Sequence, residues 1–323
     1  MPFDRASDRR SASPGLAEWV TSRERGTTTM LRMMSLISLR LGRPVGRIVL
    51  HGIAAYFFVF APAARRAARE YLSRALGRKP TAIDRYRLIF SFASTIHDRL
   101  YLINGRYDLF HISLEGEPLV RERLERGDGA FLMGAHMGSF EVTRAVGRIQ
   151  PGLAVAMAMY EDNARKISSM LTAVNPGLRP DIISLGTIDS MLQIRARLDA
   201  GTFIGVLGDR TPGAEPFVRV QFLGAPACFP TGAMRAAAIL RRPVLFMVGL
   251  YRGGNRYHVV FDKLADFSTI SANDRDSAVQ AAIRRYASML ERCCKSDPYN
   301  WFNFFDFWQE PSASADRRRS AAH

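Results

Sequence analysis

Residues 130–141 read AFLMGAHMGSFE and set the class of the fold. The first six of these residues are apolar, which is typical of a short strand that is buried on both faces. From Ser139 onward the chain changes to a helical pattern of apolar and polar residues. A buried strand that leads through a short loop into a helix is the repeating unit of α/β domains with a parallel sheet.

The same alternation of short apolar runs and helical stretches continues to about residue 310. We predict further strands at residues 153–159, 181–185, 203–207, 243–251 and 257–261. Helices are predicted near residues 139–149, 161–173, 187–200, 231–241 and 274–295. Residues 117–310 are therefore expected to form an α/β domain with a largely parallel central sheet flanked by helices.

The segment that precedes this domain is basic and has a helical, apolar pattern. We expect residues 30–116 to form a membrane-associated helical annex, with breaks near Pro44, Pro62 and Pro80. Residues 1–29 are predicted to be disordered or amphipathic, and residues 311–323 to be a disordered tail.

An apolar run, IVLHGIAAYFFVFAPAA at residues 48–64, lies inside this annex and has arginines on both sides. Arginines beside an apolar run favour contact with an anionic lipid surface. The run has the minimum length for crossing a bilayer, so an interfacial or re-entrant anchor and a true span both fit. The alternative is a buried core helix.

The basic excess of the chain is concentrated in its first third. The net charge is +15, and residues 1–110, with 19 Lys and Arg against 8 Asp and Glu, account for +11 of it. Nucleic acid is not the expected partner, because the chain has no zinc-finger spacing, RNA-recognition aromatic motif or basic heptad region. The three cysteines form neither a disulfide framework nor a metal-binding spacing, so we expect no metal and a reducing compartment.

His136 follows the first predicted strand directly. It is therefore expected at the sheet edge where the working residues of α/β proteins usually gather. Gly134 and Gly138 flank it, and glycine lets the backbone approach a ligand closely. Glu141 lies in the first turn of the next helix, from where a carboxylate can orient an imidazole that accepts a proton. The alternative is a loop histidine bonded to a helix-capping glutamate.

Three motifs carry a resemblance to a known family. The run FLMGAHMGSFE resembles the H-x4-D/E motif of the lysophospholipid acyltransferase superfamily, in particular that of the bacterial lipid A late acyltransferases. Gly208-Asp209-Arg210 follows a strand where that family has an acidic residue in a short block. Phe229-Pro230-Thr231-Gly232 resembles its F-x-T-G element, and the likeness covers residues 30–308. The chain departs from the family where Glu161 replaces the usual basic residue after Tyr160, and where the block at Asp209 reads GDRTPG.

The resemblance implies an acyltransferase in which His136 is the general base and Glu141 its partner. Its implied substrates are an acyl thioester of acyl carrier protein or coenzyme A and a hydroxyl of a membrane lipid or glycolipid, with no further cofactor. Relatives of this kind work at the cytoplasmic face of the bacterial inner membrane. A basic protein suits both an anionic membrane surface and an acidic carrier protein.

Seven residues are predicted to bind substrate. Gly138 and Ser139 are two of them, and backbone N–H groups around Gly138 and the start of the following helix are expected to face the developing oxyanion. Arg210 is expected to hold an anionic or sugar group, its alternative being a surface ion pair. Thr231 and Gly232 open a predicted helix, which suits either an anionic group or a plain helix cap. The remaining candidates are Asp209 in the acidic block and Arg165, the nearest basic residue after Tyr160.

Seven aromatic residues lie within YNWFNFFDFW at residues 299–308. We predict that this segment is buried against the sheet, and the alternative is the wall of an acyl-chain pocket or an interfacial belt. Cys293 and Cys294 lie on the preceding predicted helix and are expected to be structural.

Two other functions fit the same pattern. A catalytically inactive lipid-binding or membrane-scaffold protein would have little reason to keep both His136 and Glu141. A thioester or ester hydrolase would use the same base with water as acceptor. The absence of a G-x-S-x-G motif favours direct transfer over an acyl-enzyme.

Overall fold

The computed structural model describes residues 24–149, 152–175, 177, 181–211 and 215–309. The chain forms two compact units, Met1–Gly46 and Arg47–His323. The predictions for residues 1–23 and 310–323 therefore lie outside the described residues, and the fold that positions the candidate site belongs to the larger unit.

The N-terminal helices break at or beside the three predicted prolines. Helix α2 (Glu24–Phe60) contains Pro44 and is interrupted at Gly42, whose φ of 82° and ψ of 167° are not helical. Glycine adopts such a positive φ without steric cost. Helix α3 (Pro62–Leu76) begins with Pro62, which suits a first turn because its missing N–H would be unpaired there. Pro80 lies between α3 and α4 (Ala82–Ile103).

The apolar run at residues 48–64 is not a fully buried core helix. Leu50 and Ala54 of α2 are buried, whereas Ile48, Val59 and Phe60 are more than half exposed. Among the described residues no single helix is long and apolar enough to cross a bilayer. The stretch of α2 from Arg40 meets that requirement only together with α3, and the pair is bent by 93°.

A seven-stranded sheet forms the centre of the larger unit, in the order β1-β9-β8-β2-β5-β3-β4. Its strands are β1 (His111–Glu115), β2 (Phe131–Gly134), β3 (Val155–Tyr160), β4 (Ile182–Leu185), β5 (Phe203–Leu207), β8 (Pro243–Tyr251) and β9 (Arg256–Asp266). Strands β2, β3, β4, β5 and β8 are parallel, β9 is antiparallel to β8, and β1 is parallel to β9. The ends of the five parallel strands and the starts of β1 and β9 therefore lie at one edge, which we call the His136 edge.

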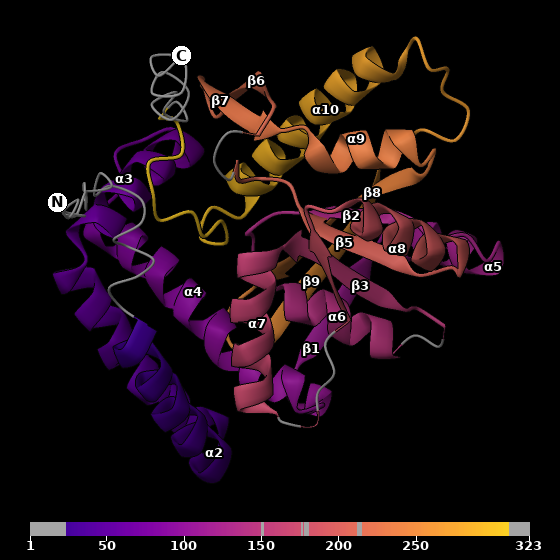
Figure 1. Cartoon of the computed structure of the whole chain (residues 1–323). Helices are drawn as coiled ribbons and strands as arrows, with labels where there is room; N and C mark the ends of the chain where they lie inside the picture. The colour runs from indigo at the N-terminus through magenta and orange to yellow at the C-terminus, as the bar shows by residue number, and fades with distance from the viewer. Residues whose placement is uncertain (1–23, 150–151, 176, 178–180, 212–214, 310–323) are drawn as a thin grey trace, which may run out of the picture. The chain divides into compact units, whose positions relative to one another are not determined.

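Helices cover both faces of this sheet (Figure 1). One hydrophobic core joins the sheet to α3, α8 (Ile188–Asp199), α9 (Gly232–Ile239) and α10 (Arg275–Ser296). A second core joins the other face to α4, α5 (Glu117–Glu125), α6 (Phe140–Ile149) and α7 (Glu161–Val174). Successive side chains of a strand point to opposite faces, so in β2 Phe131 and Met133 belong to the first core and Leu132 to the second.

The predicted fold class is confirmed. Each of the six predicted strands is present, and residues 203–207 and 243–251 coincide with β5 and β8.

The sequence analysis missed β1, α5, the short 3₁₀ helix η1 (Tyr107–Leu109) and the hairpin of β6 (Phe217–Phe222) and β7 (Ala225–Pro230). Strand β1 is an edge strand whose exposed residues are polar, so its apolar signal is weak. Two prolines in β7 hide the strand pattern, because proline cannot donate a ladder hydrogen bond.

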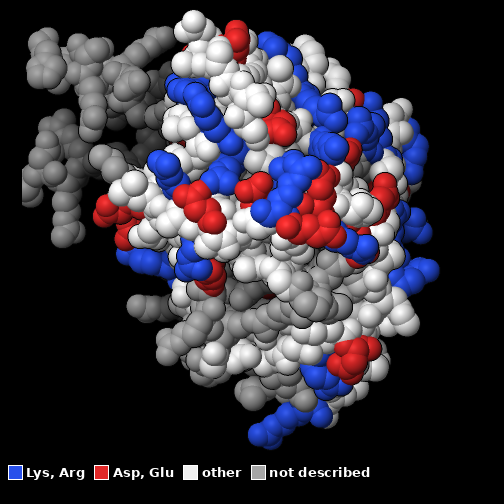
Figure 2. Space-filling view, turned by 90° about the vertical axis from the view of Figure 1, so that its right-hand side faces the viewer, with Lys and Arg blue, Asp and Glu red and all other residues white. Residues whose placement is uncertain are grey.

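Charged residues of both signs are mixed on the face shown in Figure 2. Lys and Arg side chains lie between Asp and Glu side chains across the middle of this face. Helix α5, whose ion pairs include Arg121 with Glu117 and Arg126 with Glu122, is at the same side of Figure 1. Exposed pairs of this kind contribute little to stability. The middle of this face therefore carries charges of both signs and not a single basic patch.

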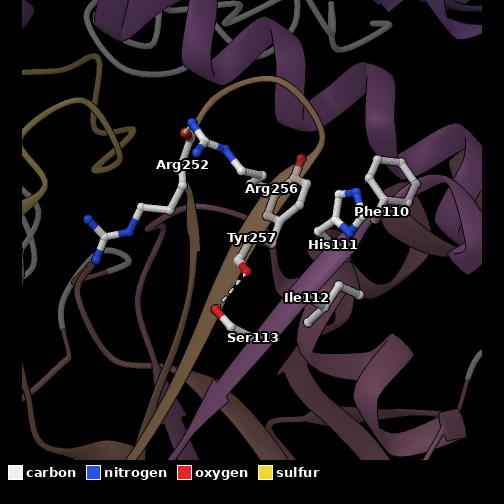
Figure 3. Close-up of a pocket in the computed structure, with 7 residues that line it drawn as sticks. All are labelled: Phe110, His111, Ile112, Ser113, Arg252, Arg256 and Tyr257. Atoms are coloured by element: carbon white, nitrogen blue, oxygen red, sulfur yellow. Dashed lines mark hydrogen bonds between the residues drawn. The ribbon is translucent and has the colours of Figure 1, made fainter.

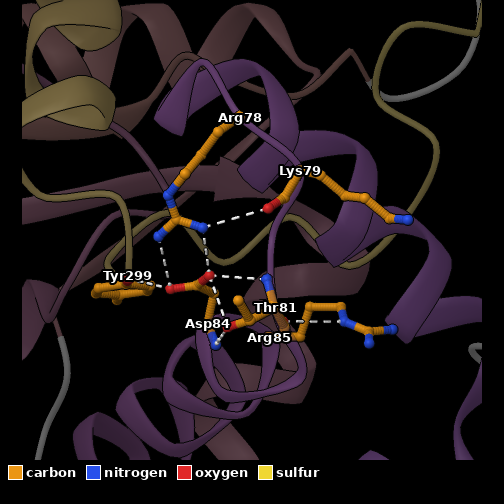
Figure 4. Close-up of polar contacts among 6 residues, drawn as sticks. All are labelled: Arg78, Lys79, Thr81, Asp84, Arg85 and Tyr299. Atoms are coloured by element: carbon orange, nitrogen blue, oxygen red, sulfur yellow. Dashed lines mark hydrogen bonds and ion pairs between the residues drawn. The ribbon is translucent and has the colours of Figure 1, made fainter.

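A buried carboxylate ties the start of α4 to the aromatic segment at residues 299–308 (Figure 4). Asp84 accepts hydrogen bonds from the Arg78 guanidinium at 2.8 and 3.2 Å, from the Thr81 amide and hydroxyl at 2.8 Å each, and from the Tyr299 hydroxyl at 2.7 Å. The bonds from Arg78 and then from Tyr299 hold the pKa of Asp84 far below its ordinary value of 3.8. Asp84 is therefore ionised at neutral pH.

We expect Asp84→Asn to lower the free energy of unfolding at pH 7 by about 1–3 kcal/mol, because charge-assisted hydrogen bonds are lost from a buried group. Since the folded pKa is depressed, the contribution of Asp84 is complete above the unfolded pKa and is lost as pH falls below about 4. Urea unfolding of both proteins at pH 7 and pH 3 measures this difference. Asp108→Asn, which removes an exposed partner of Arg106, is the control and should change stability little. Equal stability of wild type and Asp84→Asn at pH 7 would contradict the assignment.

Candidate functional site

His136 is held at the His136 edge by its backbone as well as by its ring. Its N–H donates to Asp209 Oδ2 at 3.0 Å, and its carbonyl accepts from the Phe302 amide at 2.8 Å. The next two residues form isolated bridges, Met137 with Trp301 and Gly138 with Gly249 of β8. The loop after β2 is thus fixed on both sides, while the His136 side chain stays 30% exposed.

The imidazole is paired with Asp209, which follows β5, the neighbour of β2 in the sheet. His136 Nδ1 lies 2.8 Å from Asp209 Oδ1. The other oxygen, Oδ2, accepts from Trp301 Nε1 at 2.9 Å and from Asn303 Nδ2 at 3.0 Å. Complete burial by itself raises the pKa of Asp209, but His136, Arg210 and Asn303 outweigh it and leave the pKa below the usual range. Asp209 is therefore a buried, ionised acceptor.

This pairing fixes what the imidazole can do. An ionised carboxylate only accepts hydrogen bonds, so Nδ1 carries the proton and Nε2 carries the lone pair. Among the described residues Nε2 has no hydrogen-bond partner. A partly exposed nitrogen lone pair, backed by a carboxylate that stabilises the imidazolium, is suited to general-base catalysis.

Glu141 does not form the predicted contact with His136. Within the part of the chain that the structure describes, no hydrogen bond or ion pair joins the two side chains. Glu141 is the second residue of α6, is buried, and has its Oε1 3.9 Å from Arg99 Nε of α4. The orienting contact expected of Glu141 is made by Asp209 instead, because α6 packs against α4 and Asp209 reaches His136 from the neighbouring strand end. A catalytic role for Glu141 stays a prediction.

The amides of Gly138 and Ser139 donate to backbone carbonyls in this structure, so neither is free to face an oxyanion here, and substrate binding by these residues stays a prediction. Gly138 N donates to Asn300 O at 2.8 Å, and Ser139 N donates to Gly249 O at 2.7 Å. Gly138 has a φ of 65°, and a Cβ at this position would come within 1.9 Å of Gly249 O. The glycine is therefore required for close packing of the loop on β8.

Arg210, another predicted binding residue, is held by the aromatic segment at residues 299–308. Arg210 donates from Nε to Asn303 Oδ1 at 2.7 Å and from Nη2 to Phe302 O at 3.2 Å, and its guanidinium lies 5.5 Å from the Phe305 ring. Burial lowers the pKa of Arg210, and Asp209 opposes that change. Arg210 therefore forms hydrogen bonds to the aromatic segment and not the simple surface ion pair that was the alternative.

Arg165, Thr231 and Gly232 make no bond with His136 in the described parts of the chain. Arg165 is exposed on α7, and Gly232 is exposed at the start of α9. Thr231 is buried and donates its hydroxyl to Pro216 O at 3.1 Å, which satisfies it without a ligand. Substrate binding by these residues stays a prediction. Over the described ranges, no group of three or more His, Cys, Asp or Glu side chains is arranged to hold a metal ion.

Sequence reasoning missed the polar residues of the aromatic segment. Trp301, Phe302 and Phe307 are buried, which confirms the predicted packing of residues 299–308 against the sheet. Between these aromatics, Asn300 and Asn303 are buried too. Buried asparagines must find hydrogen-bond partners, and that requirement was the available signal that this segment supports a polar site. The aromatic segment begins just after the end of helix α10.

On α10, Cys294 is buried in the first core and Cys293 packs against it, as the predicted structural role requires. Burial raises the pKa of Cys293 to about 11 and that of Cys294 well above its ordinary value. Both thiols are therefore protonated at neutral pH, when only a thiolate would be an effective nucleophile.

A comparison of the sequence with known protein families covers nearly the whole chain. A search of curated proteins found no significant match. A family model described as bacterial lipid A biosynthesis acyltransferase matches residues 23–310, which include His136, Asp209 and the aromatic segment. The chain belongs to the bacterial lipid A biosynthesis acyltransferase family.

Proposed function

We propose that the protein is an O-acyltransferase that moves a fatty acyl group from a thioester of acyl carrier protein or coenzyme A to a hydroxyl of a membrane lipid or glycolipid. Membership of the family gives the coarser statement, an acyltransferase that acts on lipid. The observation that carries the finer proposal is the His136–Asp209 pair, with a 2.8 Å contact and a partly exposed ring at the His136 edge.

In the proposed reaction His136 Nε2 accepts the proton of the acceptor hydroxyl while the oxygen attacks the thioester carbonyl. The new ester C–O bond forms and the C–S bond breaks. The proton then passes from the imidazolium to the leaving thiolate, so the enzyme returns to its starting state. Asp209 stabilises the imidazolium and keeps the proton on Nδ1 throughout. We retain Glu141 as a proposed catalytic residue, acting without a direct bond to His136.

We further propose that the protein works on an anionic membrane surface, at the cytoplasmic face of the bacterial inner membrane. Support comes from the exposed apolar side chains at the end of α2, Tyr56, Val59 and Phe60, and from the arginines that follow in α3, including Arg65 and Arg66. Apolar side chains enter the interface while neighbouring cations pair with lipid phosphates. The same basic charge would speed the approach of an acidic carrier protein.

Two other functions make different predictions in one assay. The purified full chain is mixed with vesicles of anionic lipid, an acyl thioester and a candidate glycolipid acceptor, and products are identified by mass spectrometry. The proposal expects an acylated lipid and a free thiol in equal amounts. Free fatty acid without acylated lipid would indicate a hydrolase. Failure to consume the thioester with any lipid extract, while vesicle binding persists, would indicate an inactive lipid-binding protein.

A further inference from the structure

A cavity of about 750 Å³ opens at the start of β1 and β9, where no function has been placed. Phe110 lines it just before β1, His111 and Ser113 line it from β1, and Arg252, Arg256 and Tyr257 line it from the turn and strand beside them. In Figure 3 Tyr257 lies between Arg256 and His111. The Tyr257 hydroxyl donates to the buried carboxylate of Asp98 at 2.8 Å, so the tyrosine forms a fixed wall of the cavity.

The cavity lies at the same sheet edge as His136. Gly138 bridges Gly249 of β8, and two residues later Tyr251 pairs with Tyr257 of β9. The cavity is therefore two to three strands from the His136 loop, which corresponds to roughly 10–15 Å at the usual strand spacing.

Asn300 connects the two places. Its carbonyl accepts from the Gly138 amide, and its side chain exchanges hydrogen bonds of 2.7 and 3.1 Å with the Tyr251 backbone. A ligand group in the cavity would thus be held on the same rigid framework as the His136 loop.

The side chains that line the cavity and can be charged at neutral pH are basic. Its lining contains two arginines and a histidine but no carboxylate. Arg252 is paired with Asp297 at 2.5 Å, outside the lining. The Arg256 guanidinium has a single hydrogen bond, from Nη2 to Arg252 O at 3.2 Å, and within the described residues it has no acidic partner. Arg47 donates to the Tyr251 hydroxyl and to Gly254 O, in and beside the turn that carries Arg252, at 3.1 Å each.

We infer that this cavity binds a phosphate ester of one of the two substrates, with Arg256 as its main ligand. A guanidinium offers paired N–H donors that match phosphate oxygens, and Arg256 has donors to spare. The choice of phosphate among anions rests on the proposed function. Acyl donors of both kinds carry their thioester on a phosphate-bearing arm, and phospholipids and phosphorylated glycolipids are the acceptors that carry phosphate. The distance from the cavity to His136 suits a phosphate of the acyl donor and a phosphate of the acceptor. In the donor a long chain separates the phosphate from the reacting atom, and in the acceptor a large headgroup does so.

The test compares Arg256→Gln with wild type on two donors. Acyl coenzyme A carries the phosphate-bearing arm, whereas the acyl thioester of N-acetylcysteamine lacks phosphate. If the donor supplies the phosphate, the KM for acyl coenzyme A rises about tenfold or more and that of the short thioester stays the same. If the acceptor supplies it, the KM for a phosphate-bearing acceptor rises by a similar factor with both donors.

Arg195→Gln is the matched control, because Arg195 is an exposed arginine on α8 with its own partner, Asp199, and the substitution removes the same charge. An equal KM change in the Arg195 and Arg256 variants, or no change in any KM, would overturn the site. The first of these results would mean that Arg256 acts only through the long-range field.

A binding measurement separates this inference from the proposed function. Inorganic phosphate is titrated into the full-length His136→Ala protein at constant ionic strength, and binding is followed by calorimetry. Saturable binding that is weakened about tenfold or more by Arg256→Gln supports the site even if no acyl transfer is found. Absence of saturable binding, or binding that Arg256→Gln leaves unchanged, overturns it.

Discussion

His136→Ala is expected to reduce acyl transfer by roughly 10²–10⁴-fold, because the acceptor hydroxyl loses the base that removes its proton. The fold should survive, since His136 is 30% exposed and its two backbone hydrogen bonds do not depend on its side chain. Turnover is measured with a saturating thioester, and thermal unfolding and far-UV circular dichroism check the fold.

His258→Ala is the control for this variant. His258 also lies beside a carboxylate, with Nε2 3.1 Å from Glu115, and it lies on the same sheet, but its partner Glu115 is exposed on the edge strand β1. Its loss should leave turnover nearly unchanged. His136→Gln, which keeps a hydrogen-bonding side chain opposite Asp209, protects the test against a folding defect in the alanine variant. Retention of more than about a tenth of wild-type turnover in a folded His136 variant would remove the general-base assignment.

Asp209→Asn is expected to lower kcat by a comparable factor, although asparagine has nearly the same shape. Asp209 receives four donors: the His136 amide, His136 Nδ1, Trp301 Nε1 and Asn303 Nδ2. An asparagine amide must turn its own N–H₂ group toward some of them. If the asparagine N–H₂ group faces His136, Nδ1 has to accept its hydrogen bond. The ring proton then moves to Nε2, and Nε2 loses the lone pair that acts as the base. In a serine protease, this change of tautomer costs about 10⁴-fold in kcat.

The alternative orientation of the asparagine points its N–H₂ group at Trp301 and Asn303, which leaves buried donors unpaired and lowers stability by about 1–3 kcal/mol. Asp84→Asn is the matched control, because it also alters a buried, multiply bonded aspartate but leaves the His136 partner in place. Glu141→Gln tests the sequence-based prediction separately. A folded Asp209→Asn enzyme with near wild-type kcat, beside an inactive Glu141→Gln enzyme, would return the orienting role to Glu141.

Local patterns in the sequence were enough to predict most of the fold. The runs at residues 130–135, 203–207 and 243–251 are apolar and end in turn residues, so strand identity was encoded within a few neighbouring positions. The position of His136 at the end of the first of these strands placed it at the functional edge of the sheet. Strand β1 and the β6–β7 hairpin escaped because their apolar signal is diluted by exposed polar residues or prolines.

The carboxylate that contacts the imidazole in the structure is Asp209, and the sequence pointed to Glu141. Glu141 is five residues from His136, and spacing along the chain made it the natural partner. Asp209 is 73 residues away, and it meets His136 because β5 pairs with β2 in register, with Gly134 opposite Leu207. The aromatic segment is more distant still, yet it supplies Trp301 and Asn303 to the same carboxylate. A pairing set by strand order leaves no trace in local spacing.

The sequence by itself determined the six predicted strands, the α/β class, the motifs that carry the family resemblance and the identity of the proposed base, since each of these depends on residues close together in the chain. Only the tertiary structure decided which acid stands behind His136, that the Gly138 and Ser139 amides are already occupied, and that Arg256, which has no acidic partner among the described residues, faces a cavity at the same edge. The physical reason is that hydrogen bonding and burial are satisfied between strands and segments brought together by folding, and such partners are chosen by sheet order and packing.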